Sequence, residues 1–293
     1  MGKLLVIADQ DGPGIATTRG LELARRFKRD TEVVAFVYAP LKQLKVSDAE
    51  RDKIKQRLIE DRREEVQARI DSASGPNQKV RLLVVWEKDL AGWTCKHCDK
   101  GGYDMVIKTE RRSKSLLAHT STDWQLLREC PSSVLIVAEK KWSRTKPIMA
   151  SVDLSTKLPL KKKLNEDIIA RSLALANALE TSVEIICAIE VPTLLRDLDL
   201  VDERKYVNDA KEDMAPNIKA LAKKFDIPEK AFHVKKGPAE RVIASQAAAK
   251  RAQVVVMGTV GRRGVKARLM GSTAERVLRH LKTDVLALKP RSR

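Results

Sequence analysis

Apolar residues in this chain occur in short continuous runs, which alternate with longer stretches where they recur every three or four positions. Short runs that are apolar throughout are typical of parallel strands buried on both faces, and the longer spacing is typical of amphipathic helices. Their alternation predicts an α/β protein with parallel strands and right-handed crossovers. The strands expected in this way are 3–9, 33–40, 104–107, 133–137, 146–153, 183–192, 253–257 and 284–288.

These patterns occur twice in the same order. The first strand of each half ends in an aspartate, Asp9 or Asp153, and a long charged helix follows the second strand of each half. We expect Pro216 to kink or interrupt the second of these helices. A repeat of this kind predicts two doubly wound domains, 1–140 and 146–293, joined by the polar segment 139–146.

Composition supports this organisation. A length of 293 residues suits two domains, and 43% hydrophobic with 33% charged residues is typical of a globular protein. No apolar run approaches the roughly 20 residues of a membrane span, and the start of the chain does not resemble a secretory leader, so we expect a cytoplasmic protein. Four cysteines are too few for a disulfide framework in a chain of this length.

The net charge of +18 favours anionic partners such as nucleotides, nucleic acid or acidic lipid surfaces. The basic residues are spread through both halves and do not form an arm of the kind that many nucleic-acid binders carry. Aromatic residues make up only 4% of the chain, which leaves few stacking platforms for single strands. Nucleic acid is therefore the less favoured of these partners.

A glycine-containing segment follows the strand 253–257 and precedes the last helix. Gly258 and Gly261 would let the backbone approach a ligand closely, and Gly271 would expose the amides at the start of a helix. Ligands of doubly wound sheets bind at the carboxyl ends of the strands, where this segment lies. The expected phosphate contacts are completed by hydroxyl and basic side chains, namely Ser272, Thr273 and Arg262.

Two simpler interpretations of this segment stay open. Ser272 with Glu275 also forms the sequence of a capping box, which needs no ligand, and loop glycines often serve turns alone. The segment has neither the Gly-Lys-Ser/Thr ending of a P-loop nor a Gly-x-Gly-x-x-Gly motif. P-loop hydrolysis and dinucleotide redox chemistry therefore lack their signatures.

The order of strand, aspartate, second strand and Gly-x-x-Gly-x9-Gly-Ser resembles the universal stress protein family, in its ATP-binding branch. The resemblance covers the whole chain as two copies, and the segment 122–131 is similar to the tandem, E-type members in particular. It implies two Rossmann-like, parallel five-stranded sheets of the adenine nucleotide alpha hydrolase-like kind, packed as an internal pseudo-dimer.

The resemblance also implies a bound adenine nucleotide, ATP or a relative of it, with or without Mg²⁺, in the second domain. Asp153 and Ile189 would flank the base and ribose, next to Met257. The phosphates would lie against Gly258, Gly261, Arg262, Gly271, Ser272 and Thr273.

The first half departs from this motif. The positions that correspond to Gly258 and Gly261 fall near Lys108 and Arg111, and the glycine-serine pair has become Thr120-Ser121. Side chains at these positions would block the approach of backbone to phosphate. We therefore expect no nucleotide in the first domain, although Asp9 is present.

These features predict a nucleotide-responsive binding protein, monomeric or homodimeric, with protein partners that the sequence does not identify. Only Asp153 is placed to hold a metal ion or ribose, so we expect at most slow ATP hydrolysis and no metal site. One alternative is a carrier of an apolar or lipid-like small molecule that binds no nucleotide. A second alternative is a basic protein associated with nucleic acid.

The pair Cys95-x-x-Cys98 admits a zinc site or a redox switch. A closed zinc site requires four ligands, and the chain has no second pair of this kind, so an ordinary helix is the favoured interpretation. Cys130 and Cys187 are expected to be small core residues. His280 is expected at the surface or at a helix cap.

Overall fold

The computed structural model describes residues 2–110, 121–138, 141–192, 194, 201–259, 271–281 and 283–289. These residues fall into two compact units. We call them the N-terminal unit, which includes the described residues up to 138, and the C-terminal unit, which includes those from 141 onward.

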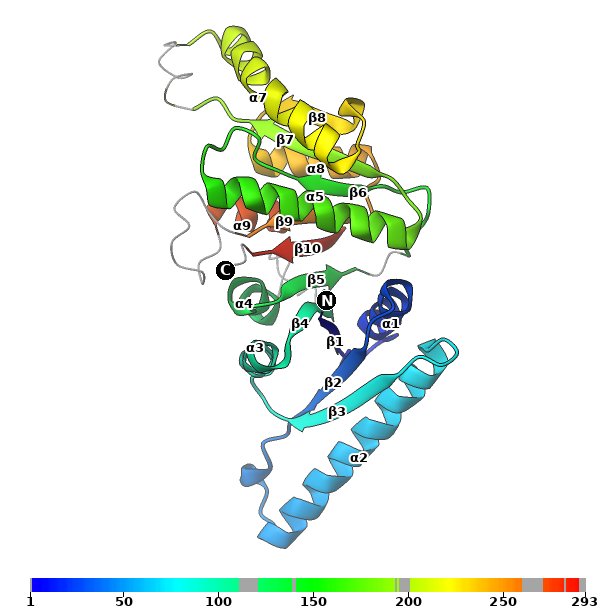
Figure 1. Cartoon of the computed structure of the whole chain (residues 1–293). Coiled ribbons are helices and arrows are strands. Elements are labelled where there is room, and N and C mark those ends of the chain that lie inside the picture. The colour runs from blue at the N-terminus through cyan, green and yellow to red at the C-terminus, as the bar shows by residue number, and fades with distance from the viewer. Residues whose placement is uncertain are drawn as a thin grey trace. The chain divides into compact units, whose positions relative to one another are not determined.

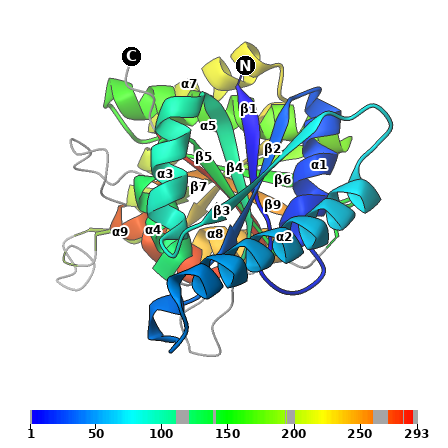
Figure 2. The ribbon, with the colours of Figure 1, turned by 90° about the horizontal axis from the view of Figure 1, so that it is seen from below.

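The N-terminal unit contains a parallel sheet with strand order β3-β2-β1-β4-β5. Figures 1 and 2 show that α1 and α2 cover one face of this sheet and that α3 and α4 cover the other. The elements are β1 (Lys3–Ile7), α1 (Ile15–Phe27), β2 (Thr31–Val37), η1 (Leu41–Gln43), α2 (Asp48–Ala73), β3 (Val80–Trp86), α3 (Leu90–Gly101), β4 (Tyr103–Thr109), α4 (Ser121–Glu129) and β5 (Ser133–Val137).

The C-terminal unit repeats this arrangement with strand order β10-β9-β6-β7-β8, again parallel. Helices α5 and α7 lie on one face, and α8 and α9 lie on the other (Figure 1). The elements are β6 (Ile148–Ser151), α5 (Pro159–Leu179), β7 (Val183–Ile189), α7 (Glu203–Phe225), η2 (Glu229–Ala231), β8 (Phe232–Lys236), α8 (Ala239–Ala249), β9 (Val254–Gly258), α9 (Ser272–His280) and β10 (Asp284–Leu288).

The central strands form the two cores. Leu5 and Val6 of β1 are fully buried, as are Val255 and Val256 of β9. Burial of each such side chain stabilises the fold by about 1.5–3 kcal/mol relative to an exposed one. Strands buried on both faces confirm the α/β class predicted from the continuous apolar runs.

Two features of the fold differ from the sequence-based expectation or extend it. The edge strands β3 and β8 have no counterpart among the strands expected from the sequence. Strand β8 ends in exposed lysines, which hide its pattern, whereas β3 was missed although it carries the continuous apolar run 82–86. Of the two outcomes expected at Pro216, a kink or an interruption, the interruption was wrong, because helix α7 continues through this residue. Proline removes one hydrogen bond of the helix, and packing of the buried Met214 and Ala222 holds the helix together.

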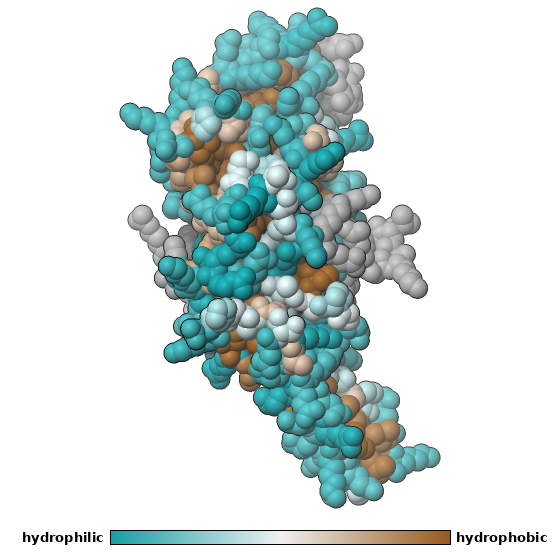
Figure 3. Space-filling view, turned by 90° about the vertical axis from the view of Figure 1, so that its right-hand side faces the viewer, coloured by the Kyte–Doolittle hydropathy of each residue, from teal (hydrophilic) through white to brown (hydrophobic). Residues whose placement is uncertain are grey.

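The described surface reflects the high content of charged residues. On the face drawn in Figure 3, hydrophilic residues predominate and apolar residues form small, separate patches. Across the described residues we find no helix whose length and apolar content would let it span a bilayer.

Candidate functional site

The strand order of the C-terminal unit places its topological switch point between β6 and β9. The chain leaves β6 for β7 on one side, and β9 pairs with β6 on the other side. Asp153 follows β6, and Gly258 is the last residue of β9. Since ligands of doubly wound sheets bind at the carboxyl ends of the strands at such a point, both residues lie where a ligand is expected.

Asp153 is held by its main chain and leaves its carboxylate accessible. Its N–H donates to Asn165 Oδ1 at 3.1 Å, and Asn165 Nδ2 donates to the Asp153 carbonyl at 2.7 Å. Ser155 Oγ donates to Asp153 Oδ1 at 2.7 Å, and Lys161 Nζ lies 3.9 Å from Oδ2. The Asp153 side chain is 45% exposed, so its position is fixed while its oxygens can still accept hydrogen bonds from a ligand.

Apolar side chains lie at the ends of the neighbouring strands. Ile189 of β7 and Met257 of β9 are each 3% exposed. Cys187, on β7, lies with its sulfur 4.0 Å from Met214 Sδ. Burial raises the pKa of the Cys187 thiol to about 11, and the negative charge of Asp153 adds to this rise. This edge therefore combines buried apolar side chains with one accessible carboxylate.

Gly258 is explained by helix packing. A Cβ atom at this position would lie 2.6 Å from Leu164 Cδ2, closer than real Cβ contacts. Leu164 lies in the first half of α5 and is buried. The close approach of α5 therefore requires a glycine here whether or not a phosphate binds.

The start of α9 has the features of an anion site. Gly271 is its N-cap, with no side-chain cap, and its own N–H donates to the Thr259 carbonyl at 2.8 Å. The capping-box interpretation is therefore wrong, because Ser272 occupies the first helical turn and Glu275 pairs with Arg279 at 2.8 Å. The first amides of a helix have no acceptor within the helix, so in α9 they can bind an anion.

The remaining predicted contacts are only partly described. Thr273 is half-buried in the first turn of α9. Ser272 is placed in the same turn by its main chain. Gly261 and Arg262 lie outside the described residues.

The corresponding edge of the N-terminal unit is occupied by its own side chains. Its switch point lies between β1 and β4. Asp9 lies shortly after the end of β1, and Thr109 is the last residue of β4. The N–H of Ala16, in the first turn of α1, donates to Asp9 Oδ2 at 3.2 Å and to Thr109 Oγ1 at 2.9 Å. The carboxylate that is accessible at Asp153 is engaged with a helix at Asp9.

The register identifies the residue that replaces Gly258. Thr109 pairs with the last residue of β5, as Gly258 pairs with the last residue of β10. Thr109, and not Lys108, is therefore the counterpart of Gly258. Thr109 is the residue next to Lys108, near which the counterpart was expected, and it carries a side chain. Arg111 and Thr120 lie outside the described residues.

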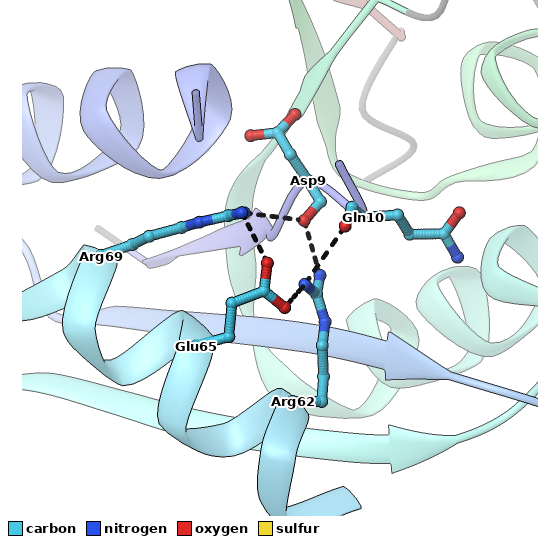
Figure 4. Close-up of polar contacts among 5 residues, drawn as sticks. All are labelled: Asp9, Gln10, Arg62, Glu65 and Arg69. Carbon is cyan, nitrogen blue, oxygen red and sulfur yellow. Dashed lines mark hydrogen bonds and ion pairs between the residues drawn. The ribbon is translucent and has the colours of Figure 1, made fainter. Parts of the chain in front are cut away.

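Two arginines of α2 cover the end of β1 (Figure 4). Arg62 Nη2 donates to the Asp9 carbonyl at 2.6 Å, and its Nη1 lies 3.5 Å from the Gln10 carbonyl. Arg69 Nη1 donates to the Asp9 carbonyl at 3.2 Å. Both arginines also pair with Glu65, each at 2.6 Å. The Arg62 side chain is only 8% exposed, so this network closes the loop after β1.

A buried ion pair in the N-terminal unit is a further difference between the two units. Lys108 Nζ lies 2.6 Å from Asp123 Oδ1, and their side chains are 8% and 0% exposed. The same strand and helix positions in the C-terminal unit are taken by Met257 and Ala274. The sequence analysis missed this pair because Lys108 and Asp123 belong to different elements.

A cavity of about 620 Å³ lies at the opposite edge of the C-terminal unit, where its strands begin. Its walls are mostly apolar, with basic side chains among them, and His280 is one of the lining residues. The residues that line it include Lys141, Lys146, Ala244, Ala248, Arg251 and Leu281. No predicted nucleotide contact is among its lining residues.

The fold defines a tandem α/β protein that consists of two doubly wound units. The model of the universal stress protein family matches residues 1–138 and 163–289. The chain belongs to the universal stress protein family and carries two tandem copies of its domain.

Relatives and solved structures agree with this assignment. The chain is 30% identical to the universal stress protein E homolog of Haemophilus influenzae, over 98% of this chain and 96% of that protein. It is 35% identical to universal stress protein E of Escherichia coli K12, over 72% of this chain and 68% of that protein. A putative universal stress protein from Pseudomonas aeruginosa has the same fold, with a TM-score of 0.70, 23% identity, and coverage of 99% of this chain and 94% of that one.

Proposed function

We propose that this universal stress protein binds ATP or a related adenine nucleotide at the carboxyl edge of its C-terminal unit and responds to the bound nucleotide. The observation that carries the proposal is the switch point between β6 and β9. The accessible carboxylate of Asp153 follows one of these strands, and the segment leading to the uncapped start of α9 follows the other.

The chemistry of the edge suits a nucleotide. The carboxylate of Asp153 would accept hydrogen bonds from ribose hydroxyls, whereas Ile189 and Met257 are each only 3% exposed and would offer the base little of their surface. The amides of Ser272 and Thr273, in the first turn of α9, would bind the phosphates. Gly258 supports the proposal least, because packing against Leu164 already accounts for it.

The bound nucleotide would act by changing a surface. The chain between Gly258 and Gly271 connects β9 to α9, so a nucleotide bound there would contribute to the surface that the C-terminal unit offers to a partner. Occupancy controls a partner only if the partner binds the occupied and the empty forms with different affinity. We infer that nucleotide occupancy controls which protein partner the C-terminal unit contacts, and that any hydrolysis is slow.

Calorimetric titration of the full chain with ATP, with and without Mg²⁺, tests the proposal. We expect one nucleotide per chain. Replacing Asp153 by Asn should weaken ATP binding tenfold or more, because a charge-assisted hydrogen bond to the ribose is lost. Gly271→Val should weaken binding at least as much, because it places a side chain at the start of α9.

Asp9→Asn is the matched control, because it makes the same change at the corresponding strand end of the N-terminal unit. ATP affinity should change by less than about twofold, since Asp9 already accepts from α1. Absence of binding, two nucleotides per chain, or equal effects of Asp9→Asn and Asp153→Asn would each contradict the proposal.

The cavity at the opposite edge supports a second candidate function, a carrier of a small apolar molecule. Its volume of about 620 Å³ suits a ligand of drug-like size, and Ala244, Ala248 and Leu281 give it apolar walls. Mass spectrometry of material released from the purified protein distinguishes the two functions. A co-purifying apolar compound, retained in Gly271→Val and lost when Ala248 is replaced by Trp, would favour the carrier.

A further inference from the structure

Three cysteines of the N-terminal unit meet between α3 and α4. Cys95 and Cys98 lie three positions apart on α3 and therefore share a helix face. Cys130 follows the last residue of α4, where its N–H donates to the Leu126 carbonyl at 3.0 Å. Helices α3 and α4 pack together, and the Cys130 thiol interacts with the side chains of both Cys95 and Cys98. All three are reduced thiols in this structure.

The three thiols differ in their access to solvent. Cys95 is partly exposed, whereas Cys98 and Cys130 are buried. The hydrogen bond from Cys95 lowers the pKa of Cys130, but the bond with Cys98 and burial outweigh it and raise that pKa to about 12. A small oxidant from solvent therefore meets Cys95 first.

The neighbouring histidine is engaged elsewhere. His97 Nε2 lies 2.6 Å from Glu32 Oε1, Tyr103 donates to the same oxygen at 2.9 Å, and the ring of Trp93 stacks on His97. Among the residues that the structure describes, no group of histidine, cysteine or carboxylate side chains is arranged to hold a metal ion. The chemistry that the three thiols offer is therefore thiol oxidation.

Helix geometry excludes one pair of thiols. Cβ atoms three positions apart on a helix are about 5–6 Å apart, whereas a disulfide requires about 3.5–4.5 Å. A bridge between Cys95 and Cys98 would therefore distort α3. Cys130 lies on another element and interacts with both Cys95 and Cys98, and of these two only Cys95 is partly exposed to an oxidant in solvent.

We propose that the N-terminal unit carries an oxidant-sensitive thiol pair, in which Cys95 and Cys130 form a reversible disulfide when the protein meets a peroxide. Cys98 packs against the pair and is not part of the bridge. The bridge would join α3 to the end of α4. This inference is independent of nucleotide binding in the C-terminal unit.

The reaction has two steps. The Cys95 thiolate, formed by loss of its proton to water, attacks one peroxide oxygen; the O–O bond breaks, and hydroxide leaves and takes up a proton. The sulfur is oxidised to a sulfenic acid and the peroxide is reduced to water. The Cys130 sulfur then attacks the Cys95 sulfur, the S–O bond breaks, and the departing hydroxide takes the Cys130 proton as a second water. A dithiol reductant reverses the bridge by exchange.

Peptide mapping of the full chain tests the proposal. The reduced protein is treated with hydrogen peroxide, remaining thiols are alkylated, and the chain is cleaved with trypsin. Cleavage after Lys96 separates Cys95 from Cys98, so the peptides 89–96 and 129–140 report on the proposed pair alone. We expect them linked, with loss of two of the four thiols and recovery of both after dithiothreitol.

Serine variants identify the partners. Cys130→Ser and Cys95→Ser should each abolish the linked peptide, while Cys98→Ser should retain it. Cys187→Ser, at the buried cysteine of the C-terminal unit, is the matched control and should also retain it. A link to the Cys98 peptide, a link between two chains only, or four unreacted thiols at a peroxide concentration that oxidises a free cysteine would each overturn the proposal.

Discussion

The two units have the same fold but treat the carboxyl edge of the sheet in opposite ways. In the N-terminal unit, Asp9 and Thr109 accept from α1, and Arg62 covers the end of β1. In the C-terminal unit, the carboxylate of Asp153 stays accessible. Met214 of α7 lies as many residues before the end of its helix as Arg62 does in α2, so it is the counterpart of Arg62. One copy of the repeat thus uses its own residues at an edge where the other copy leaves a carboxylate accessible, so exchanging residues between the copies tests which side chains make the difference.

The largest loss of unfolding free energy is expected when the buried ion pair of Lys108 and Asp123 is broken. Lys108→Met copies Met257 of the C-terminal unit and leaves the Asp123 carboxylate buried without its cation. Such a loss costs about 3–5 kcal/mol of unfolding free energy. Urea unfolding followed by tryptophan fluorescence would measure it, since three of the four tryptophans lie in the N-terminal unit.

The double variant Lys108→Met with Asp123→Ala is the control, because it installs the apolar pair of the C-terminal unit. It should recover most of the lost stability, since an apolar pair of similar volume is often as stable as a buried ion pair. A single Lys108→Met substitution that costs less than about 1 kcal/mol would show that the pair is unimportant.

A smaller effect is expected at Arg62. Arg62→Met copies Met214 and removes the shorter of the two arginine hydrogen bonds to the Asp9 carbonyl, and a hydrogen bond with a charged donor contributes about 1.5–3 kcal/mol. The matched control is Arg57→Met on the same helix, where Arg57 and its partner Asp61 are both exposed. We expect that change to cost less than about 0.5 kcal/mol. Equal costs in urea unfolding would contradict the role assigned to Arg62.

Gly258 provides a further comparison, with Thr109. Gly258→Ala places a Cβ against Leu164 and should cost about 1–3 kcal/mol of unfolding free energy. In a Leu164→Ala background the same change should cost less than about 0.5 kcal/mol, because the space is then open. If the cost is unchanged in that background, as measured by far-ultraviolet circular dichroism in urea, packing does not explain this glycine.

The sequence predicted the repeat and the parallel core correctly, because continuous apolar runs are local signals. It did not locate β8, whose exposed Lys235 and Lys236 hide the strand pattern. It also missed Leu164 as the reason for Gly258, because that contact joins residues of different elements.

The remaining misses have the same physical cause. Nothing in the sequence pairs Lys108 with Asp123, or brings Cys130 to Cys95, because these contacts depend on how a helix packs beside a strand or another helix. The pair Cys95-x-x-Cys98 was visible as a motif, but its third member lies on another element. The predicted nucleotide contacts remain predictions, and those at Gly261 and Arg262 lie outside the described residues.

The smallest expected effect is a decrease in the stability of the C-terminal unit at alkaline pH, which ionisation of Cys187 causes. Burial raises the pKa of this thiol from 9.0 to about 11. The folded state therefore keeps a proton that the unfolded state releases above pH 9. The stability that Cys187 contributes is intact below pH 9 and is lost as the pH rises toward 11. The slope of unfolding free energy against pH in this range corresponds to at most one proton.

The variant Cys187→Ala tests whether this thiol makes the stability decline with rising pH. Alanine is a suitable replacement because Ala35 occupies the same position on β2 that Cys187 occupies on β7. Urea unfolding at pH 8, 9, 10 and 11 should show a shallower decline of unfolding free energy in the variant, by up to one proton between pH 9 and 11. The lost sulfur adds an offset that does not depend on pH. Because Cys130 keeps its raised pKa of about 12, the alkaline decline of the N-terminal unit should be unchanged, and an equal flattening in both units would contradict the assignment to Cys187.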